Sequence, residues 1–306
     1  MTKYNIPLVS ICIPTYNSSS FIIKTLESVR LQNYINLEIL IIDDYSTDKT
    51  REIVHDWILN NYQLNVMFLC NIYNRGVVET CADLLSLSNG EFFQFLGADD
   101  LIYYNKISKQ VYEIKNLGHE YALVFCDVNI INEFDEVISQ SYLKEQNLNI
   151  KQVFKLGVSL SLINKNFIPS PSVLIRTSHA KESGGINKQI SFEDLDLYIR
   201  LSMNFKFGYI DEKLGSYRRL SNSLMHSSIS YIKILEATLQ CLNQYRYIKK
   251  WRKNINKKFT ELVPAVYMSN HENGKTWVKV WFRKSFTIKS AIYLFFSLFN
   301  IKYSKN

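Results

Sequence analysis

The chain has 306 residues, of which 47% are hydrophobic, and a formal net charge of +8. This length and composition allow a full hydrophobic core and exclude a disordered or low-complexity protein. The five cysteines show neither a CxxC pair nor the spacing of a zinc site, so we expect free thiols in a reducing compartment. They are Cys12, Cys70, Cys81, Cys126 and Cys241. Residues 1–7 are polar and lack the apolar core of a signal peptide, which predicts a cytoplasmic protein.

Apolar runs of strand length alternate with amphipathic stretches of helical length in the first 70 residues. The segments expected as strands or helices are 9–17, 19–32, 37–44, 48–61 and 65–70. This alternation is typical of βαβ units and of a parallel sheet. The ends of these strands therefore place polar residues at one edge of the sheet.

The next apolar run, residues 91–98, ends in the pair Asp99-Asp100. The carboxyl end of a buried parallel strand is where α/β proteins place ligands. Two adjacent carboxylates repel each other unless positive charge lies close by, and Mg²⁺ or Mn²⁺ carrying a nucleotide diphosphate would supply it. The alternative from these residues alone is that Asp99 or Asp100 caps the following helix.

Five segments together resemble the family 2 glycosyltransferases, which are inverting enzymes with the GT-A fold. The segments are VSICIPTYN (9–17), EILIIDDYSTD (38–48), NRG (74–76), GEFFQFLGADD (90–100) and SFEDLDLYIRL (191–201). The resemblance covers residues 7–223 and implies an α/β fold with a Rossmann-like, mostly parallel central sheet flanked by helices. We expect a catalytic domain over residues 1–225 and a helical, basic C-terminal region over residues 226–306.

The resemblance also implies nucleotide and metal contacts. Asp44 matches the carboxylate that hydrogen-bonds the uracil imide, which favours a UDP-linked donor. The Asp99-Asp100 pair matches the end of the family's DxD-type motif, with Gly97 in place of its first Asp. Asp99 and Asp100 are expected to hold Mn²⁺ or Mg²⁺. The expected nucleotide-binding residues are Pro14, Thr15, Tyr16, Asp44, Asn74, Asp99 and Arg218.

Asp194 matches the family's catalytic base, and Glu193 and Ser172 are expected near the donor or acceptor sugar. A carboxylate can take the proton of an acceptor hydroxyl because that hydroxyl becomes more acidic as the new bond forms. From the residues alone, other interpretations remain. Glu193-Asp194 can be an acidic first turn of a helix, Asp44 with Ser46 can be a helix cap, and Ser172 can belong to a proline-rich turn.

The segment 215–223 resembles the part of the family that closes over the diphosphate. A metal-binding histidine of that segment corresponds to Leu220 here, which leaves open whether His226 replaces it. Arg218 and Arg219 can neutralise phosphate, since guanidinium matches phosphate geometry, or they can be two solvated residues of an exposed turn. Many relatives carry an Arg-Asn pair where this chain has Cys81-Ala82.

All of the excess positive charge lies near the C-terminus. Residues 246–306 hold 14 Lys/Arg and two acidic residues, Glu261 and Glu272. Residues from Trp277 onward are aromatic and basic, but the apolar run 286–301 is shorter than a spanning helix. We expect a helix that lies on an anionic membrane surface. The alternatives are a helical pair packed on the catalytic domain or on a second subunit. Nucleic-acid binding is a third interpretation, but no recognised motif supports it.

The sequence therefore predicts a metal-dependent hexosyl- or N-acetylhexosaminyl-transferase, peripheral on the inner face of the plasma membrane. It would add one sugar to a glycan, lipid-linked in this interpretation, in surface polysaccharide or lipopolysaccharide biosynthesis. The chain lacks the QxxRW segment of processive relatives. A homo-oligomer is left open. A catalytically silent nucleotide- or glycan-binding scaffold and a nucleotidyltransferase are the alternatives, although residues 14–18 offer no glycine-rich loop for the latter.

Overall fold

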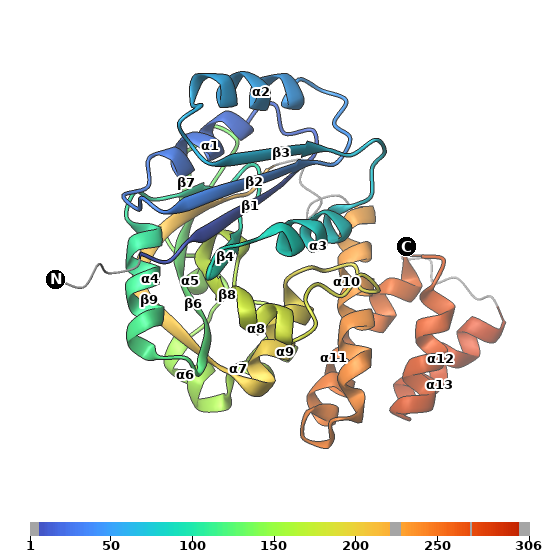
Figure 1. Ribbon diagram of the computed structural model, residues 1–306. Coiled ribbons are helices and arrows are strands. Elements are labelled where there is room, and N and C mark those ends of the chain that lie inside the picture. The colour runs from blue at the N-terminus through green and yellow to red at the C-terminus, as the bar shows by residue number, and fades with distance from the viewer. Residues whose placement is uncertain (1–5, 221–227, 270, 300–306) are drawn as a thin grey trace. The chain divides into compact units, whose positions relative to one another are not determined.

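The computed structural model describes residues 6–220, 228–269 and 271–299 (Figure 1). The chain divides into two compact units. Unit 1 comprises residues up to 159 together with 166–220, and unit 2 comprises residues 160–165 together with those from 221 onward. The expected boundary between residues 225 and 226 lies outside the described residues, so that domain division stays a prediction.

The first half of unit 1 alternates strands and helices as the hydrophobic pattern predicts. Its elements are β1 (Val9–Thr15), α1 (Ile22–Arg30), β2 (Leu37–Asp43), α2 (Thr50–Asn60), β3 (Val66–Cys70), α3 (Val77–Leu87) and β4 (Phe92–Phe95). Gly90 precedes β4 where a Cβ atom would lie 2.6 Å from the Phe92 carbonyl oxygen and from Ser10 Oγ. Only glycine therefore fits this close approach of β4 to β1.

The second half of unit 1 adds shorter strands and helices. Its elements are β5 (Leu101–Ile102), α4 (Lys106–Leu117), β6 (Tyr121–Ile131), β7 (Val137–Ser139), α5 (Tyr142–Glu145), α6 (Ile150–Leu156), α7 (Val158–Asn164), η1 (Ser170–Ser172), β8 (Val173–Arg176), α8 (Thr177–Glu182), α9 (Leu195–Asn204) and β9 (Lys206–Arg218). Helix α7 runs from unit 1 into the 160–165 segment of unit 2.

One nine-stranded sheet runs through unit 1 in the order β3-β2-β1-β4-β8-β6-β9-β5, with β7 paired to β6. The pairs β1–β2, β1–β4, β2–β3 and β6–β9 are parallel, whereas β8 is antiparallel to both of its neighbours. The α/β fold class is therefore confirmed, with a parallel first half and a mixed second half. Because β1, β2 and β4 run in one direction, their carboxyl ends lie at the same edge.

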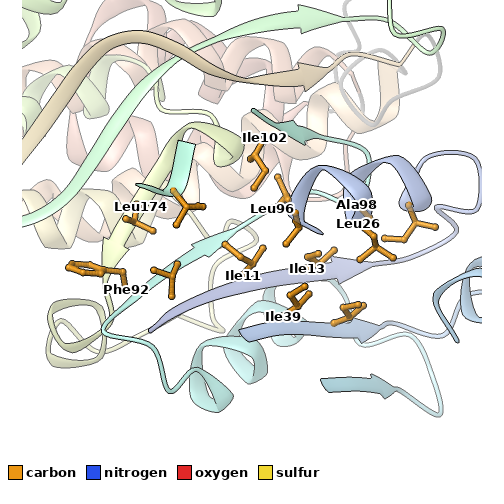
Figure 2. Packing of buried hydrophobic residues seen from close by; sticks show 14 of the residues in the cluster. Ile11, Ile13, Leu26, Ile39, Phe92, Leu96, Ala98, Ile102 and Leu174 are labelled. Atoms are coloured by element: carbon orange, nitrogen blue, oxygen red, sulfur yellow. The ribbon is translucent and has the colours of Figure 1, made fainter. Parts of the chain in front are cut away.

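Helices cover both faces of the parallel half. Ile11 and Ile13 of β1 point to the face that carries α1, where they join Leu26 in the core (Figure 2). Cys12, which lies between them, faces α3 instead, and its Sγ lies 3.2 Å from Ser88 Oγ. Successive strand residues point to opposite faces of the sheet, which is why Cys12 faces α3 while Ile11 and Ile13 face α1.

The described residues of unit 2 outside the 160–165 segment form helices joined by short connections. They form α10 (Ser228–Gln244), η2 (Tyr245–Tyr247), α11 (Lys249–Met268), α12 (Gly274–Lys284) and α13 (Ile288–Leu298). Trp277 and Trp281 of α12 are buried, and Trp277 Nε1 donates a hydrogen bond to Glu236 Oε1 (3.1 Å) on α10. The sequence suggested that the segment from Trp277 onward was a surface helix; the structure instead makes both tryptophans part of the core of unit 2.

Within the ranges that the structure describes, no helix is long and apolar enough to cross a membrane.

Candidate functional site

Asp44 directly follows β2 and holds the loop that follows β3. Its buried carboxylate accepts hydrogen bonds at Oδ1 from Asn71 Nδ2 (2.8 Å) and the Arg75 N–H (2.8 Å), and at Oδ2 from the Gly76 N–H (2.7 Å). Asn74 Nδ2 donates to the Asp44 carbonyl oxygen (3.1 Å). Asp44 and Asn74 thus lie together, as their expected roles require. A carboxylate accepts about four hydrogen bonds, so one position at Asp44 remains for a ligand N–H.

The neighbouring end of β1 carries Pro14 and Thr15, and Tyr16 follows. Thr15 is buried, and among the described residues its hydroxyl has no hydrogen-bond partner. Tyr16 is half exposed. Asn17 (φ 47°) and Tyr45 (φ 69°) both adopt the left-handed conformation that L-residues avoid. An unpartnered buried hydroxyl and local backbone strain are both features of ligand-binding sites.

Asp99 and Asp100 follow β4 in a tight turn. A Cβ atom at Gly97 would lie 2.9 Å from Asp99 Oδ1 and 2.9 Å from Asp100 Oδ2, so the two carboxylates converge on one side of this turn. Asp100 is buried, and its Oδ1 accepts a hydrogen bond from the Arg218 backbone N–H (2.8 Å). Because a Cβ atom at position 97 would crowd both carboxylates, glycine permits their close approach to this turn.

The electrostatics of this pair favour a bound cation. Burial raises the pKa of the Asp99 carboxyl, and burial together with the charge of Asp99 raises the pKa of Asp100 further. A hard divalent cation would remove this repulsion, and such ions accept one or two carboxylates plus phosphate oxygens. No cluster of three or more His, Cys, Asp or Glu side chains suited to a metal occurs among the described residues. The Asp99-Asp100 pair offers two carboxylates of the kind that such an ion accepts.

Arg218 lies behind this pair, at the end of β9. Its guanidinium donates from Nε to the Asp99 carbonyl oxygen (2.7 Å) and from Nη1 to the Asn132 carbonyl oxygen (2.6 Å). Nη2 lies 2.6 Å from Asp135 Oδ1, and the group stacks on the Phe21 ring at 4.9 Å. The side chain has no exposed surface. Arg218 therefore positions the turn at Asp99 in this structure, which differs from the phosphate contact expected from the sequence.

Glu193 and Asp194 lie at the start of α9. Asp194 is the N-cap residue of α9, where its Oδ1 accepts from the Leu195 N–H, and its Oδ2 accepts from Asn166 Nδ2 (2.9 Å). Burial raises the pKa of Asp194, against the lowering effect of the Asn166 hydrogen bond. The helix-cap interpretation is thus correct for Asp194. It is compatible with a second role, because a cap uses only part of a carboxylate.

Glu193 is the more weakly acidic member of the pair. Burial, followed by the charge of Asp194, raises the pKa of Glu193 to about 7. Carboxyl groups with perturbed pKa values are typical of acid–base sites. The charge of Asp194 thus opposes ionisation of Glu193.

Ser172 lies in the turn η1 before β8. Its side chain is buried, and its hydroxyl donates to the Pro169 carbonyl oxygen (2.7 Å). Its own carbonyl oxygen accepts from Gln110 Nε2 (2.7 Å). The structure therefore places Ser172 inside the turn, as the proline-rich interpretation has it, and not on a surface that a sugar would contact.

The motifs did not point to Tyr142, which follows β7 at the start of α5. Burial, followed by the charge of Asp194, raises the pKa of Tyr142 to about 12. Its ring lies 5.9 Å from that of Tyr217, whose pKa is raised by burial and by the charge of Asp100. The charges of Asp194 and Asp100 thus each influence one member of this ring pair. No local sequence pattern marks Tyr142.

Charged residues also connect the Asp44 loop with the loop that precedes Glu193. Arg75, whose N–H binds Asp44, places its guanidinium 2.5 Å from Asp83 Oδ2 and 3.2 Å from Glu79 Oε2 on α3. Lys188 binds the same Glu79 carboxylate at 2.6 Å. Exposed ion pairs contribute little singly, but a shared network holds both loops to one helix.

The comparison with protein families settles the class of this chain. The model of "Glycosyl transferase family 2" matches residues 10–182, more than half of the chain. The chain belongs to glycosyl transferase family 2. An uncharacterised glycosyltransferase of Rickettsia typhi is 26% identical over 93% of this chain and 82% of its own length. The amylovoran biosynthesis glycosyltransferase AmsB of Erwinia amylovora is 27% identical over 69% of this chain and 70% of its own length.

Solved structures share the fold. Residues 1–349 of S. aureus TarS in complex with UDP match with a TM-score of 0.62 at 17% identity, covering 95% of this chain and 87% of that chain. The mannosyltransferase PcManGT of Pyrobaculum calidifontis, in complex with GDP-Man and Mn²⁺, matches with a TM-score of 0.63 at 14% identity. That match covers 98% of this chain and 82% of PcManGT. The GT-A fold expected from the sequence is therefore confirmed.

The adjacent arginines Arg218 and Arg219 allow a matched test of the buried role. Arg218→Lys removes the fork that binds two carbonyl oxygens, and we expect the thermal midpoint to fall by roughly 5–15 °C. Arg219 is partly exposed and pairs with Glu145 at 2.6 Å. Arg219→Ala should leave the midpoint within about 2 °C. Thermal scanning measures both variants.

Isothermal titration with UDP completes this test. If Arg219 donates a charged hydrogen bond to phosphate, Arg219→Ala should weaken UDP binding by about tenfold. A stable Arg218→Lys protein that loses UDP affinity even in EDTA, where the metal pair plays no part, would show that Arg218 binds phosphate after all.

Proposed function

We propose that this family 2 glycosyltransferase transfers a single sugar, a hexose or N-acetylhexosamine, from a UDP-linked donor to a glycan hydroxyl with inversion. The observation that carries this proposal is the presence of two adjacent-carboxylate pairs: Asp99-Asp100, whose side chains converge beside Gly97, and Glu193-Asp194, in which Asn166 and the Leu195 N–H hold the Asp194 carboxylate. One pair suits a metal and diphosphate, and the other suits a proton acceptor. Transfer needs both, because charge develops on the leaving diphosphate while the acceptor loses a proton.

The donor base is assigned to the pocket between β1 and the Asp44 loop. The remaining acceptor position of Asp44 suits the imide N–H of uracil, and the unpartnered Thr15 hydroxyl offers a further hydrogen bond. Tyr16 supplies an exposed ring for stacking. TarS in complex with UDP is consistent with this assignment, whereas PcManGT in complex with GDP-Man shows that the fold accepts another nucleotide.

Asp99 and Asp100 are the residues that would hold Mn²⁺ or Mg²⁺. When bound, the ion acts as a Lewis acid on the leaving diphosphate. Arg218 keeps the two carboxylates in place through the Asp99 carbonyl oxygen and the Asp100 carboxylate. Leu220 supplies no ligand, and His226, the other candidate of this segment, lies outside the described residues.

Asp194 is proposed as the base. The acceptor oxygen bonds to the anomeric carbon, the bond from that carbon to the diphosphate breaks, and the acceptor proton passes to Asp194 Oδ2. Asn166 Nδ2 orients this oxygen by its hydrogen bond. Glu193, protonated below about pH 7, can donate a hydrogen bond to a sugar hydroxyl without a second negative charge beside the base.

The setting proposed is surface polysaccharide or lipopolysaccharide assembly at the cytoplasmic face of the membrane, with a lipid-linked glycan as acceptor. The amylovoran biosynthesis protein AmsB supports this setting by likeness alone. Membership of the family does not by itself specify the donor sugar, the acceptor or the peripheral location.

The decisive experiment screens the purified protein against UDP-, GDP- and dTDP-sugars for release of the nucleoside diphosphate. We expect release from a UDP-sugar, slow in water and faster with a glycan acceptor. Turnover with GDP-sugars alone would overturn the role of Asp44. Binding of UDP without any turnover would instead favour a catalytically silent scaffold.

The metal assignment predicts loss of transfer in EDTA and recovery with Mn²⁺ or Mg²⁺. Asp100→Asn removes one charge from the buried pair, so it should raise the Mn²⁺ concentration needed for half-maximal rate by about tenfold or more. Asp56→Asn, at a largely exposed carboxylate on α2, is the matched control and should behave as wild type. Full activity in EDTA would rule out the assignment.

The base assignment predicts that Asp194→Asn lowers the turnover number by roughly 100-fold or more, with UDP affinity unchanged. The wild-type rate should fall as pH decreases through the raised pKa of Asp194, because a protonated carboxyl accepts no proton. Glu193→Gln fixes the neutral form that Glu193 holds below its pKa of about 7, so its rate near pH 6 should stay within a few-fold of wild type. If UDP affinity collapses in Asp194→Asn, the residue is structural.

A further inference from the structure

Helix α13 of unit 2 turns its apolar side outward. Its inward residues include Ser290 (0% exposed) and Ser297 (6%). Its outward residues are Ile288 (81% exposed), Ile292 (46%), Phe295 (53%), Leu298 (64%) and the adjoining Phe299 (64%). Spacings of three and four residues place this set on one face of the helix, which we call the outer stripe. A helix at a water-exposed surface normally has the opposite arrangement.

The inward side of α13 holds the helix in unit 2 without using the outer stripe. Tyr293 packs its ring against Trp281 of α12 and Tyr267 of α11, each at 5.9 Å between ring centroids. Ser290 forms a capping box with Thr287. Because Ser297 Oγ donates to the Leu294 carbonyl oxygen (2.7 Å), both serine hydroxyls are satisfied within the helix. The outward position of the isoleucines and phenylalanines is thus fixed by packing.

Positive charge surrounds the outer stripe. Residues 273–299 contain no Asp or Glu and five basic residues. Arg283 and Lys284 end α12, Lys289 lies in the first turn of α13, and all three are exposed. Phe282 and Phe286, whose rings are 5.3 Å apart, flank the two basic residues. Apolar side chains therefore alternate with cations where α12 passes into α13.

We propose that the outer stripe of α13 inserts into the interfacial region of an anionic lipid bilayer, with the helix lying in the membrane plane. Eleven residues of helix span about 16 Å, whereas the hydrocarbon core is about 30 Å thick, so α13 lies at the surface. Lys and Arg at its start meet the lipid headgroups. This proposal does not rest on the transfer reaction, and it replaces Trp277 and Trp281 as the expected membrane contacts.

A second copy of the chain is the other occupant that an apolar stripe suggests. In a twofold dimer the same surface meets itself, so the basic residues Arg283, Lys284 and Lys289 of two copies would come close together. Like charges at an interface oppose association. Anionic headgroups reverse the sign of that interaction, which is why the charge pattern favours lipid.

The test compares Ile288→Asp in the stripe with Ile35→Asp as control. Ile35 lies in unit 1 and is 87% exposed, so both changes put a carboxylate on an exposed isoleucine with little effect on stability. The full chain is sedimented with vesicles of equal parts phosphatidylglycerol and phosphatidylcholine. We expect Ile288→Asp to lower the partition coefficient onto these vesicles by at least about tenfold. Ile35→Asp should leave the partition coefficient unchanged.

Two further measurements distinguish lipid binding from self-association of the chain. Vesicle binding should weaken as the salt concentration rises, and it should be weaker with vesicles of phosphatidylcholine alone. The double variant Arg283→Gln, Lys284→Gln should bind anionic vesicles as weakly as the wild type binds at high salt. Equal binding of Ile288→Asp and wild type would overturn the proposal. So would conversion of a wild-type dimer to a monomer by Ile288→Asp with vesicle binding unchanged. Transfer to a soluble acceptor should be the same in both isoleucine variants, so failure of the proposed reaction would be seen separately.

Discussion

The burial of carboxylates at the carboxyl edge of the sheet is the constraint on which the candidate site depends. Ionised carboxylates are costly to bury unless hydrogen bonds or positive charges compensate them. The parallel arrangement of β1, β2 and β4 brings Asp44 and the Asp99-Asp100 pair to the same edge. Each group must therefore be compensated locally, and the manner of compensation differs from one to the next.

These differences explain the division of roles. Three N–H groups satisfy most of Asp44, which then serves as a rigid acceptor. Arg218 reaches Asp100 only through its backbone N–H, and its guanidinium is occupied by two carbonyl oxygens and Asp135. The Asp99-Asp100 pair therefore keeps the unmet charge that a cation would neutralise. In the second pair, burial and the charge of Asp194 raise the pKa of Glu193 to about 7, so protonation of Glu193 can relieve the repulsion there.

Sequence reasoning predicted the α/β class and the convergence of the motifs because both follow from local periodicity and from strand direction. It did not predict side-chain orientation. Arg218 and Arg219 look alike in sequence, yet one is buried and the other is partly exposed, since alternate residues at the end of β9 face opposite sides. Ser172 and Tyr142 illustrate the same limit. Their positions depend on contacts with Gln110 and Tyr217 that are distant in the chain.

The C-terminal helices show why composition alone misplaces an interface. Trp277, Trp281 and Phe295 contribute equally to an aromatic, basic composition, but both tryptophans are buried: Trp277 contacts α10 and α11, and Trp281 packs against Tyr293 of α13. An amphipathic pattern gives the direction of the apolar face relative to the helix, not relative to the protein. In α13 the serines occupy the side that packs, so the apolar side has to face another apolar medium or remain in water. Only the tertiary structure distinguishes this helix from an ordinary core helix.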